Sequence, residues 1–168
     1  MARFNYDDVS GYTLEEADEA ELIASQTECT FIWANKQGWP VGVIMSYVWR
    51  DDAFWLSVSS LRVRVKAVQR DPRVAVCVTS RGTPITASRT VTYKGLAEVH
   101  DDAATIGWFL PALAERLRPG DPEAQRFFVE LNDTPNRRVI KVTPTERIGY
   151  DGAKMAQRTR EWIASGAP

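Results

Sequence analysis

The sequence predicts a mainly β protein, a small closed or nearly closed antiparallel barrel of about six strands with helices at its periphery. Three observations favour this fold. Six stretches rich in β-branched and aromatic residues are separated by turn signals, helical patterns occur only near the start, middle and end, and no repeat or linker divides the 168 residues. We therefore expect a single domain over 1–168, with a helical segment over 1–26 and a C-terminal helix over 152–168.

The first part of the chain predicts one helix followed by three strands. The residues Thr13-Leu14-Glu15-Glu16 have capping-box spacing, which predicts a helix from about Leu14 to Ser25. Lys36-Gln37-Gly38 and Asp51-Asp52 are typical turn sequences, so the strands around them form an antiparallel meander. These strands are expected at 27–34, 40–49 and 54–58.

The remainder predicts three more strands and three more helices. Asp101-Asp102 is suited to cap the first of these helices, which tolerates or kinks at Pro111. The strands are expected at 74–79, 90–99 and 138–150, and the helices at about 103–117, 122–131 and 153–165.

The connecting segment 57–73 allows two interpretations. As a strand, it places Arg62, Arg64 and Lys66 on one face with strict alternation, which is typical of a solvated surface. As a helix capped by Ser59 or Ser60, it combines free backbone N–H groups, serine hydroxyls and cations, a combination that binds phosphate. Periodicity alone leaves both interpretations open.

Composition and charge exclude several classes of protein. The net charge is −1, and the basic cluster between Arg62 and Arg73 is too local to predict a nucleic-acid surface. No apolar run is long enough to span a membrane, so we expect a cytoplasmic protein with no membrane partner. Cys29 and Cys77 lie in apolar stretches, which indicates buried, reduced thiols. With His100 they are too few to close a structural zinc site, so no metal is expected.

The order of several short motifs resembles one known family. Gly38-Trp39-Pro40 precedes an apolar strand, Phe54-Trp55-Leu56-Ser57 forms the next, and a basic stretch ends in Arg70-Asp71-Pro72-Arg73-Val74. Together with Tyr93-Lys94-Gly95 and Val142-Thr143-Pro144, this pattern is similar to the pyridoxamine 5′-phosphate oxidase-like proteins, the flavin-binding split barrels, including their deazaflavin-dependent relatives. The resemblance covers about Thr27 to Asp151 and implies a six-stranded antiparallel split barrel of the FMN-binding type.

The resemblance also implies a cofactor site at the interface of a homodimer. Its ring would lie on the backbone of the second strand, and its phosphate would be held by cations of the segment that follows the third strand. Counted back from Asp71-Pro72, Arg64 takes the place of the family's usual phosphate-binding Lys. The implied cofactor-binding residues are Val43, Ile44, Met45, Ser46, Ser57, Val58, Arg62, Arg64, Lys66 and Thr90.

The function implied is that of an oxidoreductase acting on a small organic substrate, with FMN as cofactor and the deazaflavin coenzyme F-420 as the alternative. A non-enzymatic flavin- or haem-binding protein on the same barrel is a further alternative. The chain departs from the family in having Ala67-Val68 where Asn-Leu is usual, and it lacks the later Arg and His that recognise pyridoxamine phosphate. Oxidation of vitamin B6 is therefore not expected. No catalytic residue is assigned, because the cofactor carries the hydride chemistry.

Overall fold

The computed structural model describes residue 5 and residues 7–166. They fall into two compact units. The barrel unit comprises Thr27–Cys77 and Tyr93–Arg147, and the terminal unit comprises the described residues up to Gln26, Val78–Thr92 and 148–166. The expectation of a single domain stays a prediction.

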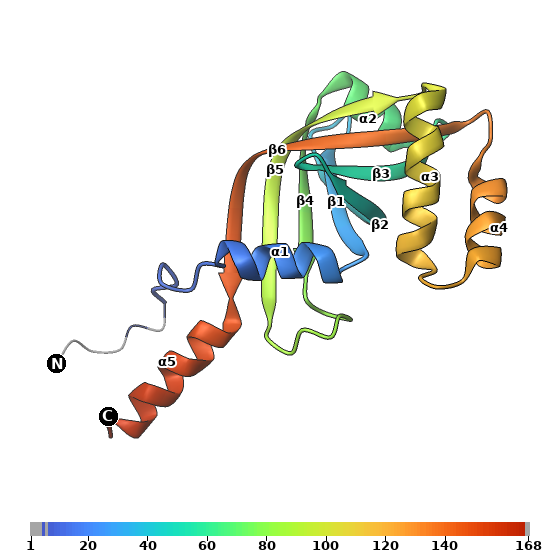
Figure 1. Ribbon diagram of the computed structural model, residues 1–168. Coiled ribbons are helices and arrows are strands. Elements are labelled where there is room, and N and C mark those ends of the chain that lie inside the picture. Colours follow the sequence, from blue (N-terminus) through green and yellow to red (C-terminus); the bar gives the residue numbers. More distant parts are fainter. Residues whose placement is uncertain (1–4, 6, 167–168) are drawn as a thin grey trace. The chain divides into compact units, whose positions relative to one another are not determined.

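Six antiparallel strands close into a barrel in the order β1-β2-β3-β6-β5-β4 (Figure 1). This confirms the predicted fold class, and every strand agrees with its expected range to within one residue. The strands are β1 (Glu28–Ala34), β2 (Pro40–Arg50), β3 (Ala53–Ser59), β4 (Arg73–Thr79), β5 (Arg89–His100) and β6 (Arg137–Asp151).

Alternating side chains build the interior of the barrel. In β1, Cys29, Phe31 and Trp33 are buried while the residues between them are partly exposed, as expected for a strand with one face in the core. Tyr47 and Phe54 are both fully buried, with ring centroids 5.1 Å apart. Asp51 and Asp52 form the β2–β3 turn, each with a φ of 52°, which is the backbone conformation of a tight hairpin.

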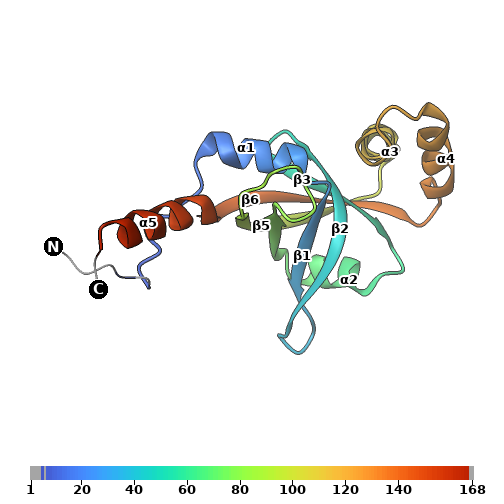
Figure 2. The ribbon, with the colours of Figure 1, turned by 90° about the horizontal axis from the view of Figure 1, so that it is seen from below.

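Five helices accompany the strands in the described residues. They are α1 (Glu16–Ser25), α2 (Val63–Arg70), α3 (Ala103–Leu117), α4 (Pro122–Asn132) and α5 (Gly152–Ala164). The barrel unit contains α2, α3 and α4, and the last two form an antiparallel hairpin (Figures 1 and 2). Phe109, Leu110 and Leu113 of α3 pack with Ala53, Trp55 and Val139 of β3 and β6. The hairpin therefore covers part of the outer surface of these two strands.

The helix ends show where local signals were right and where they were not. Asp102 caps α3 as predicted, because its side chain accepts a hydrogen bond from the Thr105 N–H. The capping box at Thr13 does not form, since α1 begins after Glu15 without a side-chain cap. Pro111 is accommodated inside α3. No helix in the described part of the chain is long and apolar enough to cross a membrane.

The terminal unit is organised around Arg89, a partly buried residue of β5. Nη2 of Arg89 lies 2.8 Å from Asp18, and Nη1 lies 2.7 Å from Glu21, so β5 is tied to α1. Asp151 caps α5 by accepting from the Ala153 N–H, and it lies 3.9 Å from Nε of Arg89. Two acidic residues of α1, Asp18 and Glu21, thus take part in the packing of this unit.

Candidate functional site

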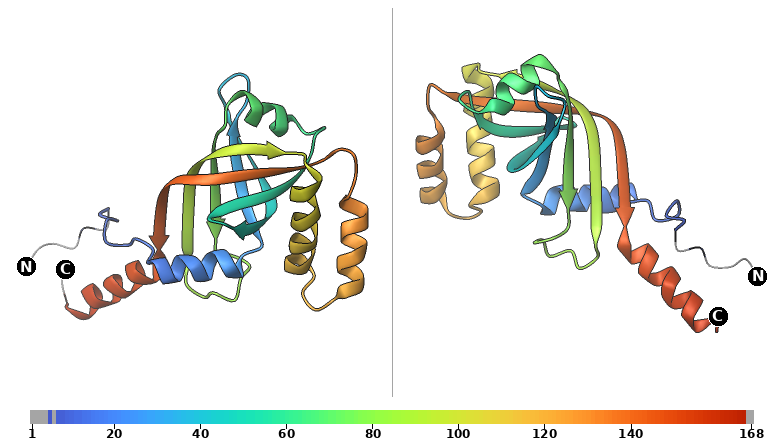
Figure 3. Two further views of the ribbon diagram at one scale, coloured as in Figure 1. Left: turned by 45° about the horizontal axis from the view of Figure 1, so that its top comes forward. Right: turned by 180° about the vertical axis from the view of Figure 1, so that it is seen from behind.

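The segment after β3 is a helix rather than a strand, which settles the ambiguity of the sequence. This short helix between β3 and β4 is visible in Figure 3. α2 begins at Val63, and Arg62 is its N-cap. The prediction of a serine cap is wrong, since no side chain caps α2. Ser59 instead accepts a hydrogen bond from the Leu61 N–H at 3.3 Å, in the turn before the helix. The β3–α2 turn therefore combines serine hydroxyls, a helix start and cations, as the helical interpretation requires.

Arg64 is the most informative of these cations. It lies in the first turn of α2, its side chain is half-buried, and its Nε is buried without a hydrogen-bond partner in the described residues. Burial, followed by the charge of Arg62, lowers the pKa of the Arg64 guanidinium. The first turn contains no acidic residue. A cation held in this way is stabilised by an anion that reaches it.

The cations at the far end of the cluster are already satisfied. Nε and Nη2 of Arg73 donate to the two carboxylate oxygens of Asp71 at 2.9 and 2.8 Å. This pair lowers the pKa of Asp71 to about 2. Arg70 donates to the carbonyl of Ala34 at 2.7 Å, which ties α2 to β1. Arg62, Arg64 and Lys66 form no ion pair within the described part of the chain, so the free positive charge is at the start of α2.

Two serines, Ser57 near the end of β3 and Ser60 in the turn, are held by Arg137, the first residue of β6, and by Asn136 just before it. Ser57 accepts a hydrogen bond from Nη1 of Arg137 at 2.8 Å. The Ser60 N–H donates to the carbonyl of Asn136 at 2.8 Å, and the two side chains are 3.2 Å apart. These contacts join residues about 80 positions apart, so local sequence patterns contain no signal for them. Arg137 and Asn136 are thus hydrogen-bond partners of this segment that the sequence analysis missed.

The predicted ring-binding segment lies on β2 of the same unit. Met45 points into the core and is 6% exposed, whereas Ile44 is 62% exposed on the outer face. Val43 and Ser46 are partly buried. On β3, Val58 points inward and is 2% exposed, so only its backbone is available to a ligand, while Ser57 faces outward beside Arg137.

The remaining predicted residue cannot be joined to this group. Thr90 is half-buried on β5 and belongs to the terminal unit, whereas the other nine predicted residues belong to the barrel unit. The assignment of all ten to cofactor binding stays a prediction. The described residues contain no cluster of three or more His, Cys, Asp or Glu side chains suited to a metal. Both cysteines are free, Cys29 buried and Cys77 only half-buried.

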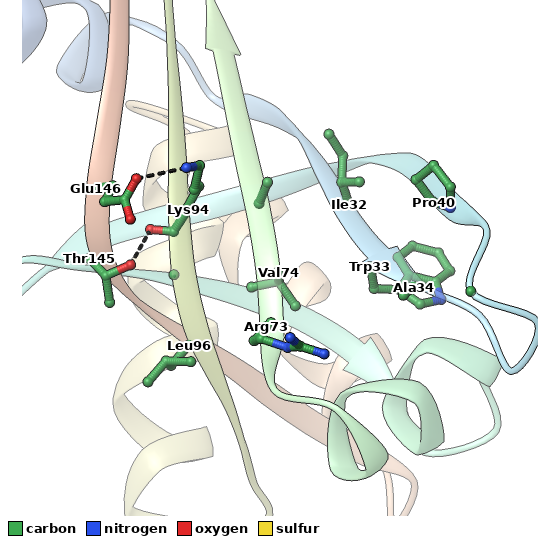
Figure 4. Close-up of a pocket in the computed structure, with 13 residues that line it drawn as sticks. Ile32, Trp33, Ala34, Pro40, Arg73, Val74, Lys94, Leu96, Thr145 and Glu146 are labelled. Carbon is green, nitrogen blue, oxygen red and sulfur yellow. Dashed lines mark hydrogen bonds and ion pairs between the residues drawn. The ribbon is translucent and has the colours of Figure 1, made fainter.

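A hollow of about 510 Å³ opens on the outer surface of the barrel unit (Figure 4). Apolar or small residues of β1, β4 and β5 line much of it, among them Ile32, Ala75 and Leu96. Gly95 is required here, since a Cβ at this position would lie 2.7 Å from the Thr143 carbonyl oxygen. At one edge, Lys94 donates to Glu146 at 2.7 Å (Figure 4).

Comparison with known proteins decides the family. The pyridoxamine 5′-phosphate oxidase family profile matches residues 16–150, which include all six strands except the last residue of β6. The chain belongs to the pyridoxamine 5′-phosphate oxidase family. This confirms the resemblance found in the sequence. No curated protein matches significantly.

Solved structures share the family's fold. A conserved hypothetical protein of Mycobacterium tuberculosis, Rv2991, is similar with a TM-score of 0.74 and 20% identity, covering 86% of this chain and 89% of that one. The haem storage protein HutZ of Vibrio cholerae has a TM-score of 0.66 at 13% identity, covering 82% and 94%. An F-420 reductase has a TM-score of 0.58 at 20% identity, covering 76% and 94%. At these identities the likeness shows the fold alone.

Proposed function

We propose that this member of the family is a flavin-dependent oxidoreductase that holds the phosphate of its cofactor at the β3–α2 turn. The observation that carries the proposal is the half-buried Arg64, whose Nε has no partner in the described residues and whose first helical turn contains no acid. A group of this kind costs free energy when its site holds no anion, and an anionic ligand offsets that cost. Membership of the family makes a flavin-type phosphate the best candidate.

Each part of the turn has a definable task. Arg64 offers donors for phosphate oxygens, while the exposed Arg62 and Lys66 attract the anion from solution. The Ser57 hydroxyl lies on the outer face of β3, beside Arg137. A flavin bound here supplies hydride transfer, and the protein's work is to bind, orient and shield it. The family comparison does not distinguish FMN from the deazaflavin coenzyme F-420, and we favour FMN.

The outer surface of the barrel suits a second copy of the chain. Ile44, Leu96 and Trp39 are 62%, 48% and 70% exposed, although they belong to the strands and the turn of the barrel unit. Exposed apolar surface of this kind favours association with another protein. Most soluble oligomers are symmetric assemblies of identical chains, so a second copy of this chain is the expected partner. We therefore propose a homodimer. Replacing Ile44 and Leu96 by Asp should give a monomer by light scattering, whereas Phe127→Asp on α4, which is 59% exposed, should leave the mass unchanged.

Ligand titration of the purified protein tests the cofactor proposal. Protein stripped of ligand by mild denaturation and refolding is titrated with FMN, riboflavin and F-420, and fluorescence reports binding. FMN should bind at least about 10-fold more tightly than riboflavin, because only FMN carries the phosphate that Arg64 is proposed to hold. Equal affinity for FMN and riboflavin would refute the assignment of Arg64 to the cofactor phosphate. Failure to bind either FMN or F-420 would refute the proposed function.

Electron transfer separates an enzyme from a carrier. With flavin bound, reduction by dithionite followed by a quinone or enone should regenerate the oxidised spectrum if the protein is an oxidoreductase. A carrier or storage protein would retain its chromophore without transferring electrons. A haem-binding protein would instead show a Soret band after incubation with haemin. This result separates the haem alternative from both a flavin-dependent enzyme and a flavin carrier.

A further inference from the structure

The connection between α4 and β6 is fastened to the β3–α2 turn by several hydrogen bonds. Arg137 is the central residue. Its Nη1 donates to Ser57 Oγ at 2.8 Å, its Nε donates to the Asn132 carbonyl at 2.7 Å, and its Nη2 donates to Asn132 Oδ1 at 2.8 Å. The neighbouring Asn136 accepts from the Ser60 N–H at 2.8 Å. Asn132 in the last turn of α4 is thereby linked through Arg137 to Ser57, and the adjoining Asn136 holds Ser60.

Strand register explains why this side chain reaches Ser57. In the β3–β6 ladder Ser57 pairs with Val139 and Ser59 pairs with Arg137. Arg137 and Ser57 are therefore diagonal neighbours on one face of the sheet, within reach of a long side chain. Packing of α3 against Trp55 and Val139 covers the adjoining part of this face. Arg137 is itself half-buried, and burial lowers the pKa of its guanidinium.

The chemistry of the contact determines which way the Ser57 hydroxyl is used. A guanidinium has five N–H donors and no acceptor, so the Ser57 oxygen must accept from Arg137. The hydroxyl proton of Ser57 is then left to be donated elsewhere, and a phosphate oxygen is an acceptor that matches it. Within the described residues, the hydrogen-bond acceptors of Arg137 are neutral oxygens, so no carboxylate draws its guanidinium away from Ser57.

We propose that Arg137 is a positioning residue for the cofactor phosphate: it fixes Ser57 as a hydrogen-bond donor and couples the α3–α4 hairpin to the β3–α2 turn. This inference rests on the proposed function. It adds a residue 80 positions from Ser57 to the phosphate site, and it assigns the hairpin a role in the geometry of that site.

The test uses Ser57→Ala, Arg137→Gln and the double variant, each titrated with FMN and with riboflavin. The two single variants should each bind FMN about 10-fold more weakly while binding riboflavin as the wild type does. The double variant should be no weaker than Ser57→Ala, because both changes remove one interaction. Arg126→Gln is the matched control, since its exposed guanidinium pairs with Glu130 on α4 and its loss should leave the ratio of FMN to riboflavin affinity unchanged.

The outcomes distinguish this inference from the proposed function. If the wild-type protein binds FMN but Ser57→Ala and Arg137→Gln bind it equally well, the inference is refuted and the cofactor proposal stands. An equal loss of FMN and riboflavin affinity in the variants also refutes it, since that result indicates general disruption of the fold. If the wild type binds neither FMN nor F-420, both fail. Should Arg137→Gln not fold, Ser57→Ala alone decides, because it leaves the contacts of Arg137 with Asn132 in place.

Discussion

Replacing Arg64 by Met separates the stability of the protein from its affinity for an anion. Met keeps an apolar stem and removes the guanidinium, whose Nε is buried without a partner and whose charge is opposed by Arg62. An unsatisfied buried polar group costs about 1–3 kcal/mol, and partial exposure places Arg64 at the lower end of that range. The ligand-free variant should therefore be as stable as the wild type or more stable by up to about 1 kcal/mol.

The affinity for FMN should change in the opposite direction. A hydrogen bond to a charged group contributes about 1.5–3 kcal/mol, so loss of Arg64 should weaken FMN binding by roughly 10- to 150-fold. Urea unfolding of the ligand-free protein and fluorescence titration with FMN measure the two quantities. Lys36→Met, at an exposed position in the β1–β2 turn, controls for the loss of one positive charge. A variant that is less stable than the wild type yet keeps its FMN affinity would contradict the reasoning at both points.

Three further predictions concern the framework of the site. Asp121→Ala should cost about 1 kcal/mol of unfolding free energy, because Asp121 caps α4 by accepting from the Ala124 N–H; Asp133→Ala, at the other end of the helix, should cost less. Burial raises the pKa of Cys29 to about 12. The unfolded thiol ionises near its ordinary pKa of 9.0, so the free energy of unfolding should decrease as the pH rises from 9 toward 12. In Cys29→Val the free energy of unfolding should decrease less steeply over this range. An identical decrease in the two proteins would exclude this thiol as its source. Gly95→Ala should cost about 1–3 kcal/mol because its Cβ meets the Thr143 carbonyl, while Gly107→Ala on the open face of α3 should stabilise by up to about 1 kcal/mol. Thermal melting of both glycine variants checks these opposite signs.

Local sequence patterns were sufficient for the elements of the barrel. Strand alternation depends only on neighbouring residues, so the range 74–79 agrees with β4 to within one residue. Turn chemistry at Asp51-Asp52 was equally local, and it produces the expected hairpin. The helix caps were less certain. Asp102 caps α3, but Thr13 does not cap α1, whose N-cap is Glu15.

The segment 57–73 shows why periodicity alone was insufficient. The alternation of Arg62, Arg64 and Lys66 fits a strand as well as it fits the flanks of a short helix. Burial decides between them, since Val65 and Val68 of α2 are 5% and 2% exposed and Ala67 between them is 5% exposed. Two adjacent buried residues are compatible with one stripe of a helix and not with the strict alternation of a half-exposed strand.

By itself, the sequence determined the strand pattern, the basic composition of the segment after β3 and the resemblance to a family that the comparison confirms. Only the tertiary structure decided which cation is desolvated without a counter-ion and which residue holds Ser57. The physical reason is that burial and hydrogen bonding depend on atoms brought together across the barrel. Ser57 and Arg137 lie 80 positions apart in the chain, yet they share a hydrogen bond of 2.8 Å.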